Sequence, residues 1–253
     1  MEQNLWLEVY KQTLPAFMCP HCNTGRLAVS KKGISRKTPH YLLQQYREAE
    51  LHDEGAGLFH AFMACQMDNC GEVVSVTGDY HVQFDYAGID NNNEPIIHED
   101  LRLRVRAVVP APRMINFSEA LADIPAGHLL KSFELFWVDL GSCANRIRIF
   151  VETLLDQFSV PRIQLRTAAK PTVLNLSQRI DELDRLKPGH SQALQTLREI
   201  GNVGSHEGAV ALSDLLDCYE ALEHTLAELL DNKSANRAAR LANIRSRKGR
   251  PSR

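Results

Sequence analysis

The chain lacks any long apolar run, and its beginning lacks the features of an export signal. No stretch approaches the roughly 20 apolar residues that a helix needs to cross a bilayer. The first 20 residues do not combine a basic start with a following apolar segment, as secretory signals do. We therefore expect a cytoplasmic protein that is not embedded in a membrane.

Several catalytic motifs are also missing. The sequence contains no GxGxxG dinucleotide fingerprint, no Walker-type phosphate loop, no GxSxG nucleophile elbow and no HExxH helix. These absences argue against the enzyme classes that depend on those motifs. The length of 253 residues, with 44% apolar and 24% charged residues, is that of an ordinary globular chain with one large or two small domains.

The last 21 residues lack acidic side chains. Residues 233–253 contain eight lysines and arginines, so the formal net charge of −2 leaves −10 for residues 1–232. We expect a basic tail that is disordered by itself. Two roles stay open: a solvated tail that keeps the chain soluble, or a contact with nucleic-acid phosphates through Arg245, Arg247 and Lys248.

Four of the six cysteines fall into two close pairs, Cys19/Cys22 and Cys65/Cys70. In a reducing compartment such pairs more often bind metal than form disulfides. Two turns that each carry two thiolates can complete a tetrahedral Zn²⁺ site, and no open position for catalysis is evident. We therefore predict a structural Zn²⁺ ion, with His21 and His60 as substitute ligands and unrelated free thiols as the alternative.

The segment around these cysteines has strand patterns. A short helix is expected near 41–50, strands at 73–76 and 80–86 with a turn at Gly78-Asp79, and a further strand at 101–109. Along the last strand the side chains of Arg102, Arg104 and Arg106 share one face. They either solvate an exposed face of the sheet or form a patch that contacts nucleic acid.

From about residue 118 the apolar spacing becomes helical. Five helices are expected, at about 125–138, 142–158, 176–186, around 197–206, and 213–230. Cys143 and Cys218 fall on apolar helix faces, and we expect them to be core residues. The predicted fold class is α+β: a small β-rich, zinc-ribbon-like head at 1–113, an all-α bundle at 114–232 and the tail at 233–253.

One helix carries a polar stripe beside a packing face. Arg198, Asn202 and His206 are spaced four apart, so they lie nearly above one another on a helix. Gly201 and Gly204 share the neighbouring face with leucines, and two glycines in one helix indicate that another backbone comes close. The stripe is either the satisfied polar side of a buried helix or a site for a phosphate or ribose.

A second polar group lies on the helix at 142–158. Asn145, Arg148 and Glu152 recur at helical spacing beside its apolar face. Arg148 and Glu152 form either a simple surface pair or a second stripe that faces the first one.

Several segments give the helical part a specific resemblance. It is similar to the bacterial family catalogued as domain of unknown function 4145, which resembles a branch of the HEPN superfamily (higher eukaryotes and prokaryotes nucleotide-binding). The cysteine-bearing head is similar to that of family members as well. The matching helical segments are Ser132–Trp137, Ala144–Arg148 with Glu152, Leu176–Ile180, Ile200–His206, Asp214–Asp217 and Lys248-Gly249.

The resemblance implies a HEPN-like helical bundle that pairs as a homodimer, and many such domains are metal-independent endoribonucleases. Carried onto this chain, the catalytic residues are Arg198 for the phosphate charge, Asn202 for orientation and His206 as general acid or base. Seven residues separate Arg198 from His206, whereas the family motif has four to six.

Three functions remain open after the sequence. The first is a protein that acts on or binds RNA or another nucleic acid, including a ribonuclease in a defence or toxin-type system. The second is a non-catalytic, zinc-containing dimerisation or adaptor module. The third is a sensor of a nucleotide or another small ligand.

Overall fold

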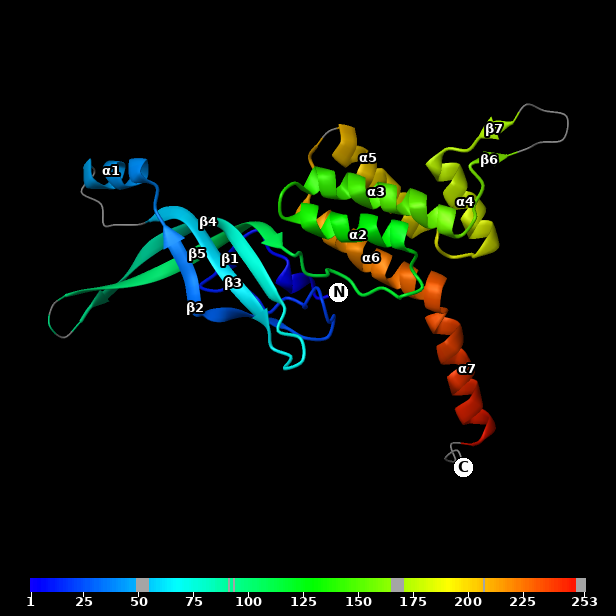
Figure 1. The fold of residues 1–253 in the computed structure, drawn as a ribbon, viewed down its shortest axis with the longest axis horizontal. Helices are drawn as coiled ribbons and strands as arrows, with labels where there is room; N and C mark the ends of the chain where they lie inside the picture. Colours follow the sequence, from blue (N-terminus) through cyan, green and yellow to red (C-terminus); the bar gives the residue numbers. More distant parts are fainter. Residues whose placement is uncertain (49–54, 91, 93, 165–170, 207, 249–253) are drawn as a thin grey trace. The chain divides into compact units, whose positions relative to one another are not determined.

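A computed structural model describes residues 1–48, 55–90, 92, 94–164, 171–206 and 208–248 (Figure 1). The chain divides into two compact units, which we describe separately. The β unit comprises residues 2–114 together with 133–139, and the helical unit comprises Met1, 115–132 and 140–253. The mixed α+β class is as predicted, with an antiparallel sheet in the N-terminal region followed by helices.

The β unit is built on one five-stranded sheet in the order β1-β5-β4-β3-β2, and every neighbouring pair is antiparallel. A short 3-10 helix at Gln3–Leu5 precedes the sheet, and α1 (His40–Glu48) lies in the connection between β2 and β3. The strands are β1 (Tyr10–Lys11), β2 (Leu27–Lys37), β3 (Ala56–Cys65), β4 (Val73–Ile89) and β5 (Pro95–Val109).

The prediction of a turn at Gly78-Asp79 is wrong, because β4 runs through this position without interruption. Gly78 lies at a register shift between β4 and β5. A Cβ atom on Gly78 would lie 2.0 Å from the backbone oxygen of Arg104. The glycine therefore permits a close approach of two strands at a bulge, which is the other common meaning of a glycine in a strand pattern.

Aromatic side chains dominate one part of the β-unit core. The ring centroids of Trp6 and Phe17 are 5.3 Å apart, and Trp137 lies 5.5 Å from Phe17 and 5.1 Å from Phe136. Phe136 and Trp137 come from the segment 133–139, which has a helical pattern in the sequence. That pattern did not reveal that the two rings belong to the β-unit core.

The predicted helices are present close to their expected bounds, and they belong to the helical unit except for residues 133–136 at the end of the first one. They are α2 (Asp123–Phe136), α3 (Leu140–Gln157), α4 (Leu176–Leu186), α5 (Ser191–His206) and α6 (Leu212–Asp231). The buried leucines, isoleucines and phenylalanines of α3 and α6 form its core. Cys143 and Cys218 are buried there, as predicted.

The two glycines of α5 lie against α3. A Cβ atom on Gly201 would come within 2.4 Å of the Arg148 Cβ atom, and one on Gly204 within 2.4 Å of the Gly141 oxygen. The prediction that another backbone comes close to this helix is therefore confirmed.

The basic tail differs from the expectation of disorder. Residues Lys233–Ser246 form helix α7, which continues from the end of α6 (Figure 1). Alanine, arginine and leucine, which are strong helix formers, make up much of this segment. Between α3 and α4 the chain contains a two-stranded pair, β6 (Ile163–Gln164) with β7 (Thr172–Val173). No described helix is both long and apolar enough to span a bilayer.

Candidate metal centre and helical site

Four thiols converge in the β unit. The Sγ atoms of Cys19, Cys22, Cys65 and Cys70 all lie within 4.8 Å of one another. Cys19 is 3.7 Å from Cys70, and Cys22 is 3.7 Å from Cys65. The two cysteine pairs that the sequence suggested as ligands therefore form one cluster that could hold a metal ion.

The β2–β3 hairpin explains how two cysteine pairs with 42 residues between them come together. Cys19 and Cys22 lie on the turn that precedes β2, and Cys65 is the last residue of β3. In the hairpin Leu27 pairs with Cys65, so the chain leaves the cluster along β2 and returns to it along β3. The long insert is therefore a hairpin with α1 in its connection.

Backbone hydrogen bonds shape both turns. On the first turn, the amide of Cys19 donates to the Gly25 oxygen over 2.9 Å, and the amide of Gly25 donates to Cys22 Sγ over 3.2 Å. On the second turn, the amide of Cys70 donates to the Met67 oxygen over 2.9 Å. These bonds orient the thiols of both cysteine pairs toward the same point.

Gly25 is a residue of this site that the sequence analysis missed. A Cβ atom there would lie 2.4 Å from Cys65 Sγ and 2.6 Å from the Met67 side chain. Only glycine leaves room for the second cysteine pair to approach the first. The available signal in the sequence was the position of this glycine, three residues after Cys22.

The four thiols differ in acidity. Backbone N–H groups of Thr24 and Gly25 lower the pKa of Cys22 to about 6, because they stabilise its thiolate. Burial raises the pKa of Cys19 to about 12. A cation at the centre of the cluster would favour the thiolate form of all four side chains.

The two histidines considered as substitute ligands lie outside this cluster of ligand atoms. The side chain of His21 is 70% exposed and its Nδ1 atom lies 4.0 Å from a Glu72 carboxylate oxygen. His60 lies on β3, where its Nε2 atom is 3.3 Å from the Ser75 hydroxyl.

Arg198, Asn202 and His206 all lie on α5, as their spacing predicted. The Arg198 guanidinium donates to Gln195 Oε1 over 2.8 Å and to Glu199 Oε1 over 3.1 Å, so residues of its own helix engage it. Asn202 is half-buried, whereas His206 is exposed at the last position of the helix. At about 1.5 Å of rise per residue, roughly 12 Å of helix axis separates Arg198 from His206.

The expected second group lies on α3. Arg148 and Glu152 form an ion pair of 3.1 Å, and each side chain is about one-third exposed. Arg148 also packs against Gly201, the residue before Asn202, so the α3 group and the α5 stripe come together at this point. Asn145 is half-buried one turn earlier on α3.

The expected nucleic-acid contacts are scattered among several environments. Arg106 donates to Asp79 over 2.6 Å and Arg102 to Asp100 over 2.7 Å, while Arg104 is exposed on the same strand. Arg245 is exposed on α7, and Arg247 and Lys248 follow the end of that helix. The two carboxylates reduce the positive charge of the β5 row.

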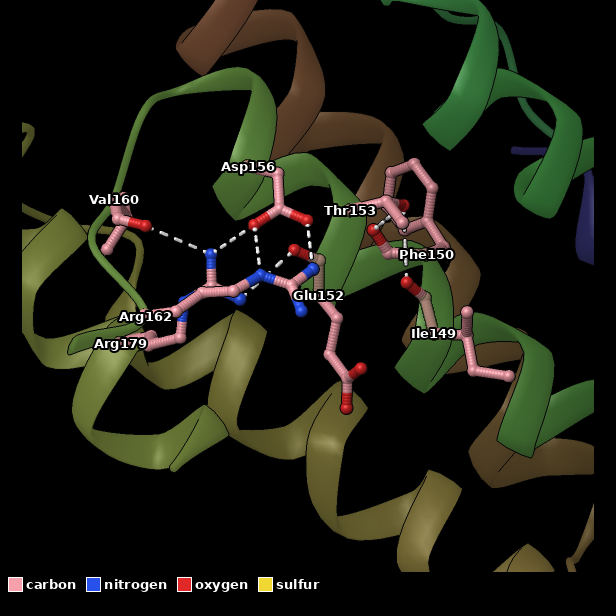
Figure 2. A network of polar contacts seen from close by, with 8 residues as sticks. All are labelled: Ile149, Phe150, Glu152, Thr153, Asp156, Val160, Arg162 and Arg179. Atoms are coloured by element: carbon pink, nitrogen blue, oxygen red, sulfur yellow. Dashed lines mark hydrogen bonds and ion pairs between the residues drawn. The ribbon is translucent and has the colours of Figure 1, made fainter. Parts of the chain in front are cut away.

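A network on α3 and α4 involves residues that the sequence analysis did not assign to a site (Figure 2). Arg179, only 4% exposed, donates to Asp156 Oδ1 over 2.7 Å and to the Val160 oxygen over 3.1 Å. Arg162 reaches the same carboxylate with two donors. The hydrogen bond from Arg162 lowers the pKa of Asp156 most, and the hydrogen bond from Arg179 lowers it further. Arg179 belongs to the Leu176–Ile180 segment of the family resemblance, and its burial gives that segment a structural role.

Comparisons with known proteins match two separate regions of the chain. Residues 7–101 match the family model described as Domain of unknown function (DUF8608). Neither the curated proteins nor the solved structures contain a match to the chain. Residues 131–247 match the family model described as Domain of unknown function (DUF4145), which supports the similarity of the helical segments to that family.

Proposed function

We propose that the chain is a zinc-containing dimerisation or adaptor module, with a zinc-ribbon-like β unit and a HEPN-like helical unit. The observation that carries the proposal is the spacing of the four thiols. In a tetrahedral site with Zn–S bonds of about 2.3 Å, neighbouring sulfurs lie about 3.8 Å apart. The Cys19–Cys70 and Cys22–Cys65 distances are both 3.7 Å.

The donor set also fits zinc. Four thiolates in tetrahedral arrangement suit Zn²⁺ or an iron site, whereas magnesium and calcium prefer oxygen ligands. With four protein ligands the metal has no position left for a substrate, so its role is structural. It would tie the turn before β2 to the end of β3, and structural zinc contributes on the order of 10 kcal/mol to folding.

Metal content tests this assignment. The full chain from zinc-replete cells is expected to carry about one zinc ion per chain, while Cys19→Ser and Cys65→Ser lose it. Cys218→Ala, a buried cysteine outside the cluster, is the matched control and should keep its metal. Bound iron in place of zinc, or full zinc content in both serine variants, would contradict the proposal.

Three features favour a binding role over catalysis. Two of the five N–H donors of Arg198 are engaged by Gln195 and Glu199, and two turns of helix separate Arg198 from His206. Two arginines of the β5 row are paired with carboxylates. An adaptor needs none of these groups to be available for a phosphate.

The second candidate is a metal-independent endoribonuclease that acts on RNA in a defence or toxin-type system. It is favoured by the contact between Arg148 and Gly201, which puts a second cation beside the α5 stripe. In this mechanism His206 would take the proton of an RNA 2′-hydroxyl as general base, so that the 2′-oxygen attacks the adjacent phosphorus and the bond from phosphorus to the 5′-oxygen breaks. The leaving 5′-oxygen would receive its proton from the same stripe of a second copy acting as acid, and an arginine would stabilise charge on the phosphate. Asn202 would orient the phosphate.

Incubation of the purified chain with total RNA, without added metal, separates the two candidates. A ribonuclease would cleave RNA, and His206→Ala would abolish cleavage while leaving the helical content unchanged. His98→Ala changes an exposed histidine of β5 and serves as the control. Absence of cleavage by the wild type, or equal cleavage by wild type and His206→Ala, would remove this mechanism.

A further inference from the structure

A large cavity lies between α5 and α6, on a different side of α5 from the Arg148 contact. Its volume is about 770 Å³, and its lining includes apolar side chains such as Ile200, Val203 and Ala221. Arg198, Asn202 and His206 are not among its lining residues. We call this cavity the α5–α6 groove; the function proposed above makes no use of it.

Acidic side chains predominate among the charged residues of the groove, although Glu199 already accepts a hydrogen bond from Arg198 over 3.1 Å. Glu199, Asp214 and Asp217 line it, together with His190 and His224, whereas no lysine or arginine is among its described lining residues. Along α6 the lining runs from Asp214 to Thr225, which at 1.5 Å per residue is roughly 17 Å of helix. The groove therefore suits an elongated occupant whose apolar side chains are flanked by basic ones.

Helix α7 has these properties. From Lys233 to Ser246 none of its residues is buried. Even its large apolar side chains lie open to solvent, with Leu241 60% and Ile244 48% exposed. These two side chains are three residues apart and so share one face. Arg237, Arg240 and Arg245 flank them, and the whole tail carries no acidic residue. Isolated helices of fewer than about 12–15 residues are only marginally stable in water, so a helix of this length gains from a partner.

The groove of the same chain is out of reach for α7. Asn232 is both the last cap of α6 and the first cap of α7, so one residue separates the two helices. Two antiparallel helices that pack side by side need a connection of about 2–5 residues. With both helices at full length, α7 cannot fold back along α6, and the available groove is that of another molecule.

We propose that α7 of one copy lies in the α5–α6 groove of a second copy, and that the two copies exchange this helix reciprocally. Leu241 and Ile244 contact the apolar lining, while the flanking arginines approach Glu199, Asp214 and Asp217. A reciprocal exchange gives a closed dimer with two equivalent interfaces. The inference rests on the proposed dimerisation function and names the surface and the segment that perform it.

Two variants of the full zinc-loaded chain test the exchange. Leu241→Glu/Ile244→Glu places acids on the apolar face of α7, and Ala221→Arg places a cation in the groove. Each is expected to be monomeric in sedimentation velocity at concentrations where the wild type is a dimer. Leu186→Glu and Ile124→Arg change side chains of the helical unit that are 69% and 70% exposed, and they should remain dimeric.

Mixing the variants provides the decisive measurement. The groove variant keeps an intact α7 and the helix variant keeps an intact groove, so an equimolar mixture should form a heterodimer through one exchanged helix. Dimers in either single variant, or no heterodimer in the mixture, would overturn the inference. The inference would also be overturned if the wild type were monomeric and its α7 served only to bind RNA. Zinc content, measured on the same samples, reports the metal assignment independently of dimerisation.

Discussion

Arg179 Nη2 lies 2.7 Å from Asp156 Oδ1 and joins α4 to the end of α3 (Figure 2). The Arg179 side chain is 5% exposed, whereas Asp156 is 37% exposed and is also held by Arg162. The pair therefore combines a desolvated cation with a carboxylate that still reaches water. Removal of the cation leaves Asp156 with a surface partner, but removal of the carboxylate leaves a buried guanidinium without its charged partner.

Replacement of Arg179 tests this asymmetry. Loss of one member of a buried pair costs about 3–5 kcal/mol, and the exposure of Asp156 reduces this to about 2–3 kcal/mol for Arg179→Met. Asp156→Asn is expected to cost at least as much, because Arg179 stays buried. Chemical denaturation followed through the helical signal gives both values. A double variant whose cost equals the sum of the single costs would show that the two residues do not interact.

Asp184 gives the helical unit a dependence on acid. Its carboxylate accepts hydrogen bonds from the amides of His190, Ser191 and Gly189, at 2.9, 2.9 and 3.0 Å, where α5 begins. These bonds favour the charged form and lower the pKa of Asp184. The stabilisation is therefore present above the unfolded value of about 3.9 and is lost as the pH falls through the folded pKa.

The expected result is a smaller acid sensitivity in Asp184→Asn than in the wild type. The free energy of unfolding, measured from neutral pH downward, should differ most between the two proteins at neutral pH and converge below about pH 4. Glu119→Gln, an exposed residue before α2, is the control for the loss of one charge. Since metal loss in acid affects every variant, the differences between variants carry the result. A constant difference across the pH range would contradict the role of Asp184.

Two glycines in helices should respond oppositely to alanine. At Gly201 a Cβ atom would collide with Arg148 and with the Ala144 oxygen at 2.9 Å, so Gly201→Ala should cost about 1–3 kcal/mol. At Gly127 on α2 nothing lies within 4 Å of the added atom, so Gly127→Ala should gain about 0.5–1 kcal/mol. Thermal unfolding compares them directly. A stabilised Gly201→Ala variant would rule out the close packing of α3 on α5.

The contrast between Gly201 and Gly78 shows what the sequence can predict. On α5 the period of the leucines fixed the helix independently of its glycines, so the glycines themselves signalled close packing. In β4 the same residue type had two local meanings, a turn or a bulge. Strand pairing with β5 decided between them, and that pairing depends on residues about 26 positions away, as the Gly78 contact with Arg104 illustrates.

Charge partners were harder to predict than metal ligands. The cysteine pairs are recognisable because each pair is local and the metal explains why two pairs meet. Asp156 and Arg179 are 23 residues apart on different helices, and only the packing of α4 on α3 brings them together. In the sequence, Arg102 and Arg106 look like part of an unpaired basic row. In the structure, the pairing of β4 with β5 brings Asp79 beside Arg106, and the side chain of Arg102 turns to Asp100 of its own strand.

Gly25 offers the sharpest test of how the two cysteine turns fit together. An alanine Cβ atom would lie 2.4 Å from Cys65 Sγ, so the end of β3 that carries Cys65 must move away from Cys19 and Cys22. Gly25→Ala keeps all four thiols but should release zinc to a chelator about 10–100-fold faster than the wild type, by analogy with changes that misorient metal ligands. Lys32→Ala, an exposed change on β2, should release zinc at the wild-type rate. Equal rates in Gly25→Ala and the wild type would mean that the space beside Cys65 does not set the geometry of the cluster.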